Sequence, residues 1–340
     1  MSLAPSGTFV LGNLKYSAHS SSIAVSLGLL PAVNNFRVEL PGSVQVSAAP
    51  GDPATLELDG GEGSETVLTG KVRSFRRAIL STRVLAADGG FDLNALRPAA
   101  TYQKKGASDV IRALASDANV EVNNLDLDLP MAAYIAAQNR TAAQHVALLA
   151  LLAGATARME AKGQITADGP PGGQPDLALE YGREILEYEV RELPPAQVSR
   201  IAVGNGPAGS TDSPDALRWS KDPLPQGAPD PGTSAVWTAN SILRTPGSAT
   251  KASEAMDGQA AARAQALRCR CFLLPKLRPG MVVQVEKLPR DLPGGPWQII
   301  RVFHRLTATE GGTTLFEARI AGSQSGSLLA AALSAVGSLL

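Results

Sequence analysis

The sequence predicts a mainly β fold with α insertions, an α+β architecture in which two β-rich blocks flank a helical region. Apolar and polar residues alternate at period two from about residue 8 to 87 and again after residue 155, as is typical of half-buried strands. The 340 residues include 33 glycines and 24 prolines, which favours many turns over a helical bundle. With 44% hydrophobic residues, the chain can build the cores of two or three domains.

The first β block is predicted between residues 8 and 87. Phe36 to Leu40 alternates apolar with charged residues, and Val44 to Val46 continues the pattern. Two longer candidate strands follow at 66–75 and 78–86. Short polar or glycine-rich breaks separate these segments.

Two helices are predicted in the middle of the chain. Ser108 is placed to cap a helix that runs through Asp117, with apolar residues on one face. The second helix has a capping box, because the Thr141 hydroxyl can accept from the amide of Gln144 and the Gln144 side chain can reach back. An apolar stripe follows, and Gly154 is the expected stop.

The rest of the chain returns to β structure. A short strand is predicted between the two helices, at 125–129, and more strands after Gly154, at 155–160, 164–167, 177–181, 185–190 and 198–203. The segment 204–234 is dense in Pro, Gly, Ser and Asp, which predicts a long loop. An Ala-rich helix is predicted at 253–267 and a final β block at 268–320.

The two β blocks share a pattern. In the first, Gly51 follows a proline, precedes a strand and a Gly-rich turn, and lies 21 residues before Val72. In the last, Gly280 follows a proline, precedes a strand and a Pro/Gly turn, and lies 22 residues before Val302. Another strand follows in each case. This is the pattern of a duplicated small β-barrel.

Charge and hydropathy limit the classes of partner. Lys+Arg and Asp+Glu both number 31. The chain therefore lacks the excess of positive charge that would indicate specific nucleic-acid binding. The first five residues lack the basic segment of a secretory signal. No apolar run reaches the ~20 residues that cross a bilayer. The expectation is a protein made in the cytoplasm without stable membrane insertion.

The residues that can carry chemistry do not form a recognisable catalytic or cofactor site. Gly204 to Gly209 matches G-x-G-x-x-G, but no helix or βαβ unit follows, so a strand-ending loop is favoured over a nucleotide site. The three histidines, His19, His145 and His304, are scattered, and none has an accompanying nucleophile motif.

Two pairs of residues are candidate metal ligands. Cys269 and Cys271 share a strand face, but no second Cys/His cluster completes a zinc site, and two small buried thiols are the simpler interpretation. Asp126 and Asp128 lack the ligand spacing of a calcium loop, which favours a solvated strand face. No catalytic residue, cofactor or metal site is therefore assigned.

Two segments are candidates for partner contacts. Trp219 lies in the long loop, and exposed aromatic residues in loops often anchor interfaces. The apolar C-terminal tail is about 20 Å long as a helix, too short to cross a bilayer, so it is expected to dock on a partner or on its own domain. Its candidate contact residues are Leu328, Leu329, Leu333, Val336, Leu339 and Leu340.

Several segments, taken in order, resemble the late control protein D family of contractile phages, which is akin to the hub part of type VI secretion spike proteins. The resemblance covers residues 8 to 320. The segments that carry it are 51–52 with 68–72, the helix 108–115, 138–150, the "L-x-P-G" at 277–280, the "W-x-I-x-x-V-x-H" at 297–304, and 314–319. Ala142 replaces the family's usual acid, and the family's Phe is missing from the same helix.

The resemblance implies two tail-tube-like small β-barrel domains plus a helical inserted region. The implied divisions are residues 1–100 for the first barrel (completed by about 155–200) and 101–154 for the helical insertion. The long loop follows at 201–234, the second barrel at 235–322 and the apolar tail at 323–340.

The function that the resemblance implies is a structural baseplate hub, not an enzyme. Three copies would form a homotrimeric adaptor that joins a sixfold tail tube to a threefold spike and lines the channel for a tape-measure protein or other cargo. The chain has no needle segment, so a separate spike protein is expected, with other baseplate proteins as further partners in a virion tail or injection-system particle. The alternatives are a tail-tip cell-wall-degrading enzyme and a host-surface binding module.

Overall fold

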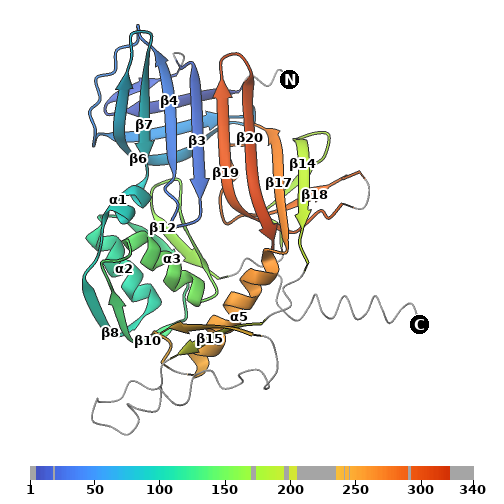
Figure 1. Cartoon of the computed structure of the whole chain (residues 1–340). Coiled ribbons are helices and arrows are strands. Elements are labelled where there is room, and N and C mark those ends of the chain that lie inside the picture. Colours follow the sequence, from blue (N-terminus) through green and yellow to red (C-terminus); the bar gives the residue numbers. More distant parts are fainter. Residues whose placement is uncertain are drawn as a thin grey trace.

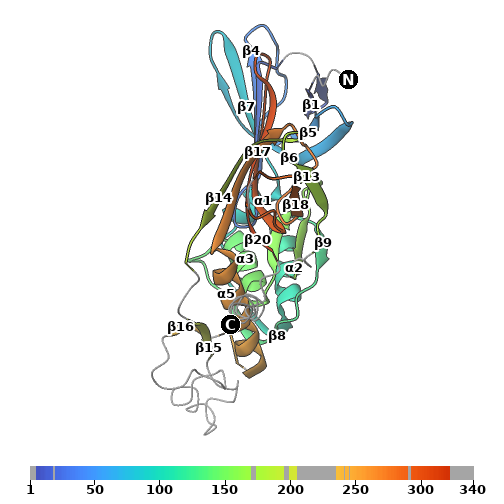
Figure 2. The same ribbon diagram turned by 90° about the vertical axis from the view of Figure 1, so that its right-hand side faces the viewer.

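The computed structural model describes residues 5–17, 20–169, 174–194, 199–204, 235–240, 242–244, 246–289 and 292–321. It confirms a mainly β chain with helices, in which most strands belong to one large, largely antiparallel sheet. Figures 1 and 2 show the helices α2, α3 and α5 gathered at one end, while β4 and β7 reach away from them at the other.

The first β block supplies one half of the large sheet. Its hydrogen-bonded order is β3-β4-β7-β6-β5-β1-β2, with every neighbouring pair antiparallel. The strands are β1 (Ser6–Leu11), β2 (Leu14–Tyr16), β3 (Ser22–Gly28), β4 (Asn35–Pro41), β5 (Pro53–Asp59), β6 (Ser64–Arg77) and β7 (Ser81–Ala87).

The last β block supplies the other half. Its order is β14-β17-β20-β19, with β18 beside β19 and β13 beside β18. Strands β13 and β14, from the segment expected to complete the first domain, pair here with β18 and β17. The strands are β13 (Leu177–Glu180), β14 (Ile185–Glu192), β17 (Gln265–Phe272), β18 (Val282–Glu286), β19 (Trp297–Thr307) and β20 (Gly311–Ile320).

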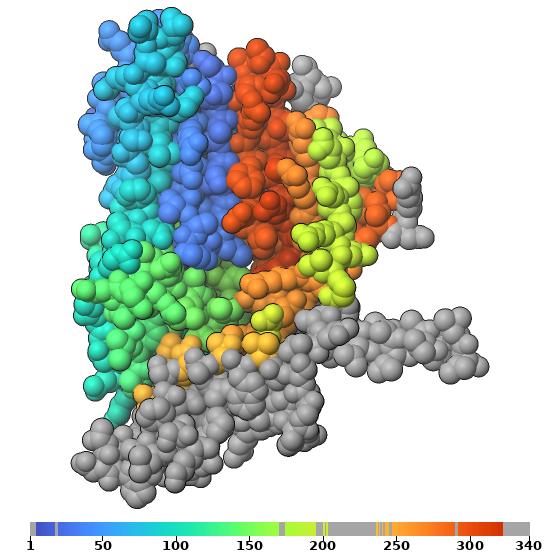
Figure 3. Space-filling model, in the orientation of Figure 1, coloured from blue at the N-terminus to red at the C-terminus, as the bar shows by residue number. Residues whose placement is uncertain are grey.

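The two halves join where β3 pairs with β19, from Arg301 opposite Gly28 to Thr307 opposite Ser22. Figure 3 shows these segments, far apart in the sequence, side by side in blue and orange. One apolar core continues beneath both halves, from Phe9 and Phe36 to Trp297 and Phe316. The hydrogen-bonded order of the described strands is an open path, so two separately closed barrels are not observed.

The same order of six strands occurs twice. β3-β4-β7-β6-β5-β1 in the first half corresponds to β14-β17-β20-β19-β18-β13 in the second, and the strands follow the same succession along the chain. One pairing differs, because β1 lies antiparallel to β5 whereas β13 lies parallel to β18. The duplication therefore extends well beyond the hairpins that the sequence pattern indicated.

Hydrogen bonds fix the alignment of the two copies. The Gly51 amide donates to the Val72 carbonyl and the Val72 amide to the Asp52 carbonyl, both at 2.8 Å. The Gly280 amide donates in the same way to Ile299, whose amide donates to Met281, again at 2.8 Å. Both glycines have positive φ, +99° and +94°. The residue equivalent to Val72 is thus Ile299, and the alignment predicted with Val302 is wrong by three residues.

A β-bulge and a row of side chains that face the core repeat with the same alignment. The register shifts directly after Val72 in β6 and directly after Ile299 in β19. Reading across the sheet, the row Val25, Phe36, Ala86, Val72 matches the row Val190, Leu267, Ala318, Ile299.

The helical region follows β7 and has its own apolar core. The antiparallel pair β8–β10 and the three-stranded β11-β12-β9 accompany its helices. Strand β8 was not predicted. The elements are α1 (Gly89–Ala95), β8 (Ala100–Gly106), α2 (Ala107–Asp117), β9 (Val122–Leu125), β10 (Pro130–Ala136), α3 (Ala142–Leu152), β11 (Thr156–Met159) and β12 (Ile165–Asp168).

The capping prediction for α3 is confirmed and that for α2 is corrected. Thr141 Oγ1 accepts from the Gln144 amide at 3.2 Å, and the Thr141 amide donates to Gln144 Oε1 at 2.9 Å. Helix α2 instead begins after Gly106, whose amide donates to the Asp109 carboxylate at 3.3 Å. Ser108 lies inside the helix, and its hydroxyl donates to the Leu127 carbonyl.

The predicted strand at 125–129 is largely wrong. Only Leu125 belongs to a strand, β9, and the following residues are extended without a ladder. Their alternation still describes burial, because Leu125, Leu127 and Leu129 contribute to the core of the helical region. The Asp126 amide still donates to the Ala167 carbonyl of β12 at 2.9 Å, whereas the Leu129 carbonyl accepts from the first residue of α2 at 3.0 Å, so the segment passes from a strand partner to a helix terminus.

The connection between β14 and β17 contains a parallel strand pair and a helix. β15 (Ser199–Gly204) pairs with β16 (Ala235–Asn240), and α5 (Pro246–Ala262) begins seven residues before the predicted start at 253. Two alanines of α5, Ala249 and Ala252, are buried in the core of the helical region. Helix α5 therefore ties the second half of the sheet to the insertion.

Candidate functional site

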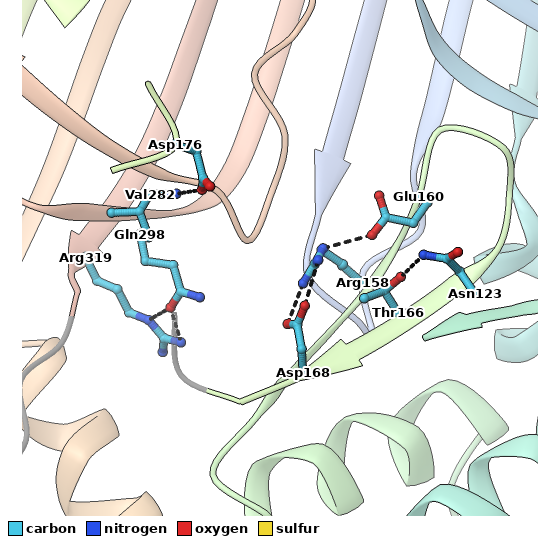
Figure 4. Close-up of polar contacts among 9 residues, drawn as sticks. All are labelled: Asn123, Arg158, Glu160, Thr166, Asp168, Asp176, Val282, Gln298 and Arg319. Carbon is cyan, nitrogen blue, oxygen red and sulfur yellow. Dashed lines mark hydrogen bonds and ion pairs between the residues drawn. The ribbon is translucent and has the colours of Figure 1, made fainter. Parts of the chain in front are cut away.

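Arg158 is the centre of a junction between the helical region and both halves of the sheet. It lies on β11, and its guanidinium makes two bonds to Asp168, at 2.7 and 2.9 Å, and one to Glu160 at 3.1 Å. Figure 4 shows the three side chains converging. Burial alone lowers the pKa of Arg158, but the two carboxylates outweigh it, and the net pKa is raised. The cation is therefore held permanently charged in its place.

Both halves of the sheet contact this junction. Arg158 forms an isolated bridge with Leu29, directly after β3 of the first half. From the second half, Gly280 packs against the Arg158 side chain, and Arg278 donates to the carbonyls of Thr66 and Val67 on β6. Figure 4 also shows Asp176 accepting from the Val282 amide, at 2.8 Å. Four stretches that are distant in sequence, at residues 29, 66–67, 158–176 and 278–282, thus meet at one place.

Alanine at Gly280 is expected to destabilise the fold more than alanine at its equivalent, Gly51. Both have positive φ, which costs alanine about 1–2 kcal/mol. A Cβ at Gly280 lies 2.8 Å from Arg158 Cδ, whereas a Cβ at Gly51 meets nothing within 4 Å. Urea unfolding should therefore show a loss larger by roughly 1–2 kcal/mol for Gly280→Ala. Equal losses contradict a tight Arg158 junction.

A hollow of about 440 Å³ opens beside the junction. Its lining mixes acidic and basic side chains, including Arg158, Asp168, Asp176 and Arg278. Each of these four is engaged by the hydrogen bonds described above. The hollow therefore presents charges of both signs, each of them bonded to another part of the chain, and we interpret the cluster as the structural joint of the molecule.

The two described histidines are buried and structural. His145 Nδ1 lies 2.5 Å from the Tyr134 hydroxyl and Nε2 lies 3.0 Å from the Ala137 carbonyl. His304 Nδ1 lies 2.9 Å from Thr314 Oγ1, which also accepts from the Leu274 amide. Burial, assisted by Arg278, lowers the pKa of His304 to about 3. His304 is thus neutral at physiological pH, and its hydroxyl partner Thr314 is fully buried with it.

The cysteine and aspartate pairs do not form metal sites in the described part of the chain. Cys269 and Cys271 are fully buried on one face of β17, and burial raises the pKa of Cys269 to about 12 and that of Cys271 well above its usual value. Both are inert thiols, as the simpler interpretation predicted. Asp128 instead pairs with Lys251 of α5 at 3.0 Å.

Among the residues that the structure describes, the most exposed large apolar side chains lie at the tip of the β6–β7 hairpin. Ile79 is 96% exposed and Leu80 is 85% exposed, and Arg76 and Arg77 precede them on β6. Two adjacent aliphatic side chains at a protruding tip have no role in this chain's own core and are suited to contact another molecule. Nothing in the sequence pattern had singled them out.

The residues chosen from the sequence as partner contacts, Trp219 and the six apolar residues between Leu328 and Leu340, lie outside the described residues and stay predictions. His19 and the motif residues after Gly204 lie outside them as well. Gly204 itself ends β15 beside β16. Among the described helices, none has the length and apolar character needed to cross a membrane.

No protein-family model and no curated protein matches the sequence. Solved structures do. The 43 kDa tail protein of prophage MuSo2 from Shewanella oneidensis matches with a TM-score of 0.68 at 13% identity, over 93% of this chain and 98% of that one. A tail protein from Neisseria meningitidis matches with 0.67 at 13% identity, over 93% and 96%.

A third structure comes from a secretion machine. An E. coli component of the type VI secretion system, described as similar to the T4 phage tail proteins gp27 and gp5, matches with a TM-score of 0.61 at 10% identity, over 93% of this chain and 77% of that one. The chain therefore has the fold that phage tail proteins share with this component, as the segments quoted from the sequence implied.

Proposed function

We propose that this chain is the structural hub of a baseplate in a contractile tail or injection system, acting as a trimeric adaptor between a sixfold tube and a threefold spike. The observation that carries the proposal is the duplicated order of six strands within one chain. Three copies supply six similar units around one axis, so the ring can match a sixfold partner on one side and a threefold partner on the other.

Each set of six strands serves as one tail-tube-like unit. The first unit contains β1 and β3–β7, the second contains β13, β14 and β17–β20, and the helical region packs against both. The hydrogen-bonded order of each unit is open rather than closed. Open edges are hazards in a monomer, but a ring can pair them between neighbours.

The role is structural rather than enzymatic. The structures that share the fold are described as tail proteins and as a secretion-system component, and the Arg158 junction joins parts of the chain to one another. A separate spike protein, the tail tube, other baseplate proteins and a tape-measure protein or cargo are the proposed partners. Equal numbers of acidic and basic residues, 31 each, suit a channel that must not hold its cargo electrostatically.

The proposal is tested by the symmetry of the purified particle. Single-particle electron microscopy of the chain, alone and co-expressed with the neighbouring spike gene, should show threefold rings with six similar units. A monomer under both conditions contradicts the proposal.

A further inference from the structure

The pairing of β3 with β19 joins the two units within one chain and shows which strand edges can join one unit to another. One edge of β19 is shared between two strands: β18 pairs with Trp297 and Gln298, and β3 of the other unit then pairs with Arg301 to Thr307. Strand β3 is in turn bonded on its other side to β4. The joint is therefore made by the edge of β19 that β18 leaves free and by the edge of β3 that faces away from β4.

The equivalent edge in the first unit is open. β6 is the equivalent of β19, and β5 covers its edge only as far as Lys71, with Gly51 and Asp52 bonding to Val72. On that side, no described strand pairs with Ser74 to Arg77.

The complementary edge is open as well. β14 is the equivalent of β3, and it pairs with β17 on one side. From Glu187 to Glu192, no described strand pairs with its other side, the side that β3 uses to bind β19. Figures 1 and 3 show β14 and the first unit on opposite sides of the molecule, so the two open edges cannot be paired within one chain.

We propose that β14 of one copy pairs in antiparallel fashion with residues Ser74–Arg77 of β6 in the next copy, repeating the β3–β19 joint between chains. This inference rests on the proposed trimeric hub and names its contact. The alignment of Val72 with Ile299 fixes the register. His304 lies five residues after Ile299 and opposite Val25, so Arg77, five residues after Val72, lies opposite Val190, which is the equivalent of Val25.

The chemistry of the two edges is complementary. The open end of β6 carries Arg76 and Arg77, and both are exposed. The open edge strand β14 carries three exposed glutamates, Glu187, Glu189 and Glu192. In this register Glu192 is the diagonal neighbour of Arg77, and Glu189 is the diagonal neighbour of Arg76, which are favourable cross-strand arrangements. Arg76 also lies directly opposite the exposed Arg191, an unfavourable like-charge pair, so the charge complementarity of the contact rests on the glutamates.

The exposed hairpin tip fits the same joint. Ile79 and Leu80 directly follow the pairing segment, and the register carries Ile79 toward Tyr188 of the neighbour. Half-buried Tyr188 already packs against the main core, so it offers an apolar surface to an incoming aliphatic side chain. The contact is head-to-tail and closes after three copies, leaving neither edge open.

Cysteine cross-linking tests the contact directly. Arg76 and Arg191 lie opposite each other in the proposed register and are both exposed. The double variant R76C/R191C, oxidised as the full chain, should give covalent dimers and trimers on a denaturing gel. The control is R37C/R191C. Arg37 is exposed but lies on β4, which is paired on both sides within the chain, so this variant should stay monomeric. The native cysteines are fully buried and do not interfere.

A charge exchange provides a second readout. Each of R77E and E192R should weaken trimer formation by roughly tenfold in sedimentation, and their combination should restore it. Trimers that neither cross-link nor show this rescue overturn the β6–β14 contact while the hub proposal stands. Chains that remain monomeric as wild type, alone and with the spike, overturn both.

Discussion

Replacing Trp297 with alanine is expected to lower the free energy of unfolding by about 3–5 kcal/mol. Trp297 is the largest of the fully buried side chains. It lies opposite Val283 of β18 and Ile320 of β20. Its side chain therefore lies where three strands of the second unit, β18, β19 and β20, meet. Its indole Nε1 donates to the Tyr188 hydroxyl at 3.1 Å, and that hydroxyl donates to the Pro293 carbonyl.

The control for this prediction is Trp297→Phe. Phenylalanine retains most of the buried ring but loses the bond to Tyr188, so a smaller loss of about 1–2 kcal/mol is expected. Urea unfolding followed by circular dichroism measures both. A loss below about 1 kcal/mol for the alanine variant, which a well-packed core does not tolerate, means that the second unit is not held together at this residue.

The second large effect is a pH dependence that originates at Asp88. This carboxyl caps α1, accepts from the Gly90 amide at 2.9 Å and is 1% exposed. Burial raises its pKa to about 7, against the lowering effects of Gly90, Asn34 and Arg73. In the unfolded chain the same group titrates near pH ~4. The folded state therefore holds this proton over a range in which the unfolded state has released it.

The direction in which the free energy of unfolding changes with pH follows from proton linkage. The stabilisation from Asp88 is fully present below about pH 4 and is lost as pH rises toward 7, with an upper limit of roughly 4 kcal/mol. Asp88→Asn removes the titration, so the variant should become progressively more stable than the wild type between pH 4 and pH 7.5. His304, with its lowered pKa, contributes equally to both proteins and cancels in the difference. A difference that does not change with pH contradicts the prediction.

Local signals in the sequence predicted local structure well. The capping box at Thr141 gave the start of α3, and the strands after Gly154 were placed to within a few residues. The repeated Pro-Gly and turn pattern indicated a duplication that the structure extends to six strands. These features depend on neighbours in the chain, which periodicity and turn chemistry can reveal.

Features that depend on distant partners were missed. The alternation at 125–129 identified the leucines that face the core, but a strand also needs a ladder partner, and at Leu129 the start of α2 takes that place. The spacing in the sequence aligned Val72 with Val302. The hydrogen bond of Gly280 goes to Ile299 instead, and Ile299 is therefore the equivalent of Val72. The Arg158 junction has no motif, because its partners come from separate segments. The open edges of β6 and β14 follow from pairing, which no single segment encodes.

Two similar units per chain are proposed to build a ring of six from three chains. Single-particle electron microscopy of the full chain, alone and with its neighbouring spike, measures this most directly. The expected result is a threefold ring with a central channel, in which the joint between chains resembles the β3–β19 joint within each chain. A monomer in both preparations, or a ring whose two kinds of joint are unrelated, contradicts it.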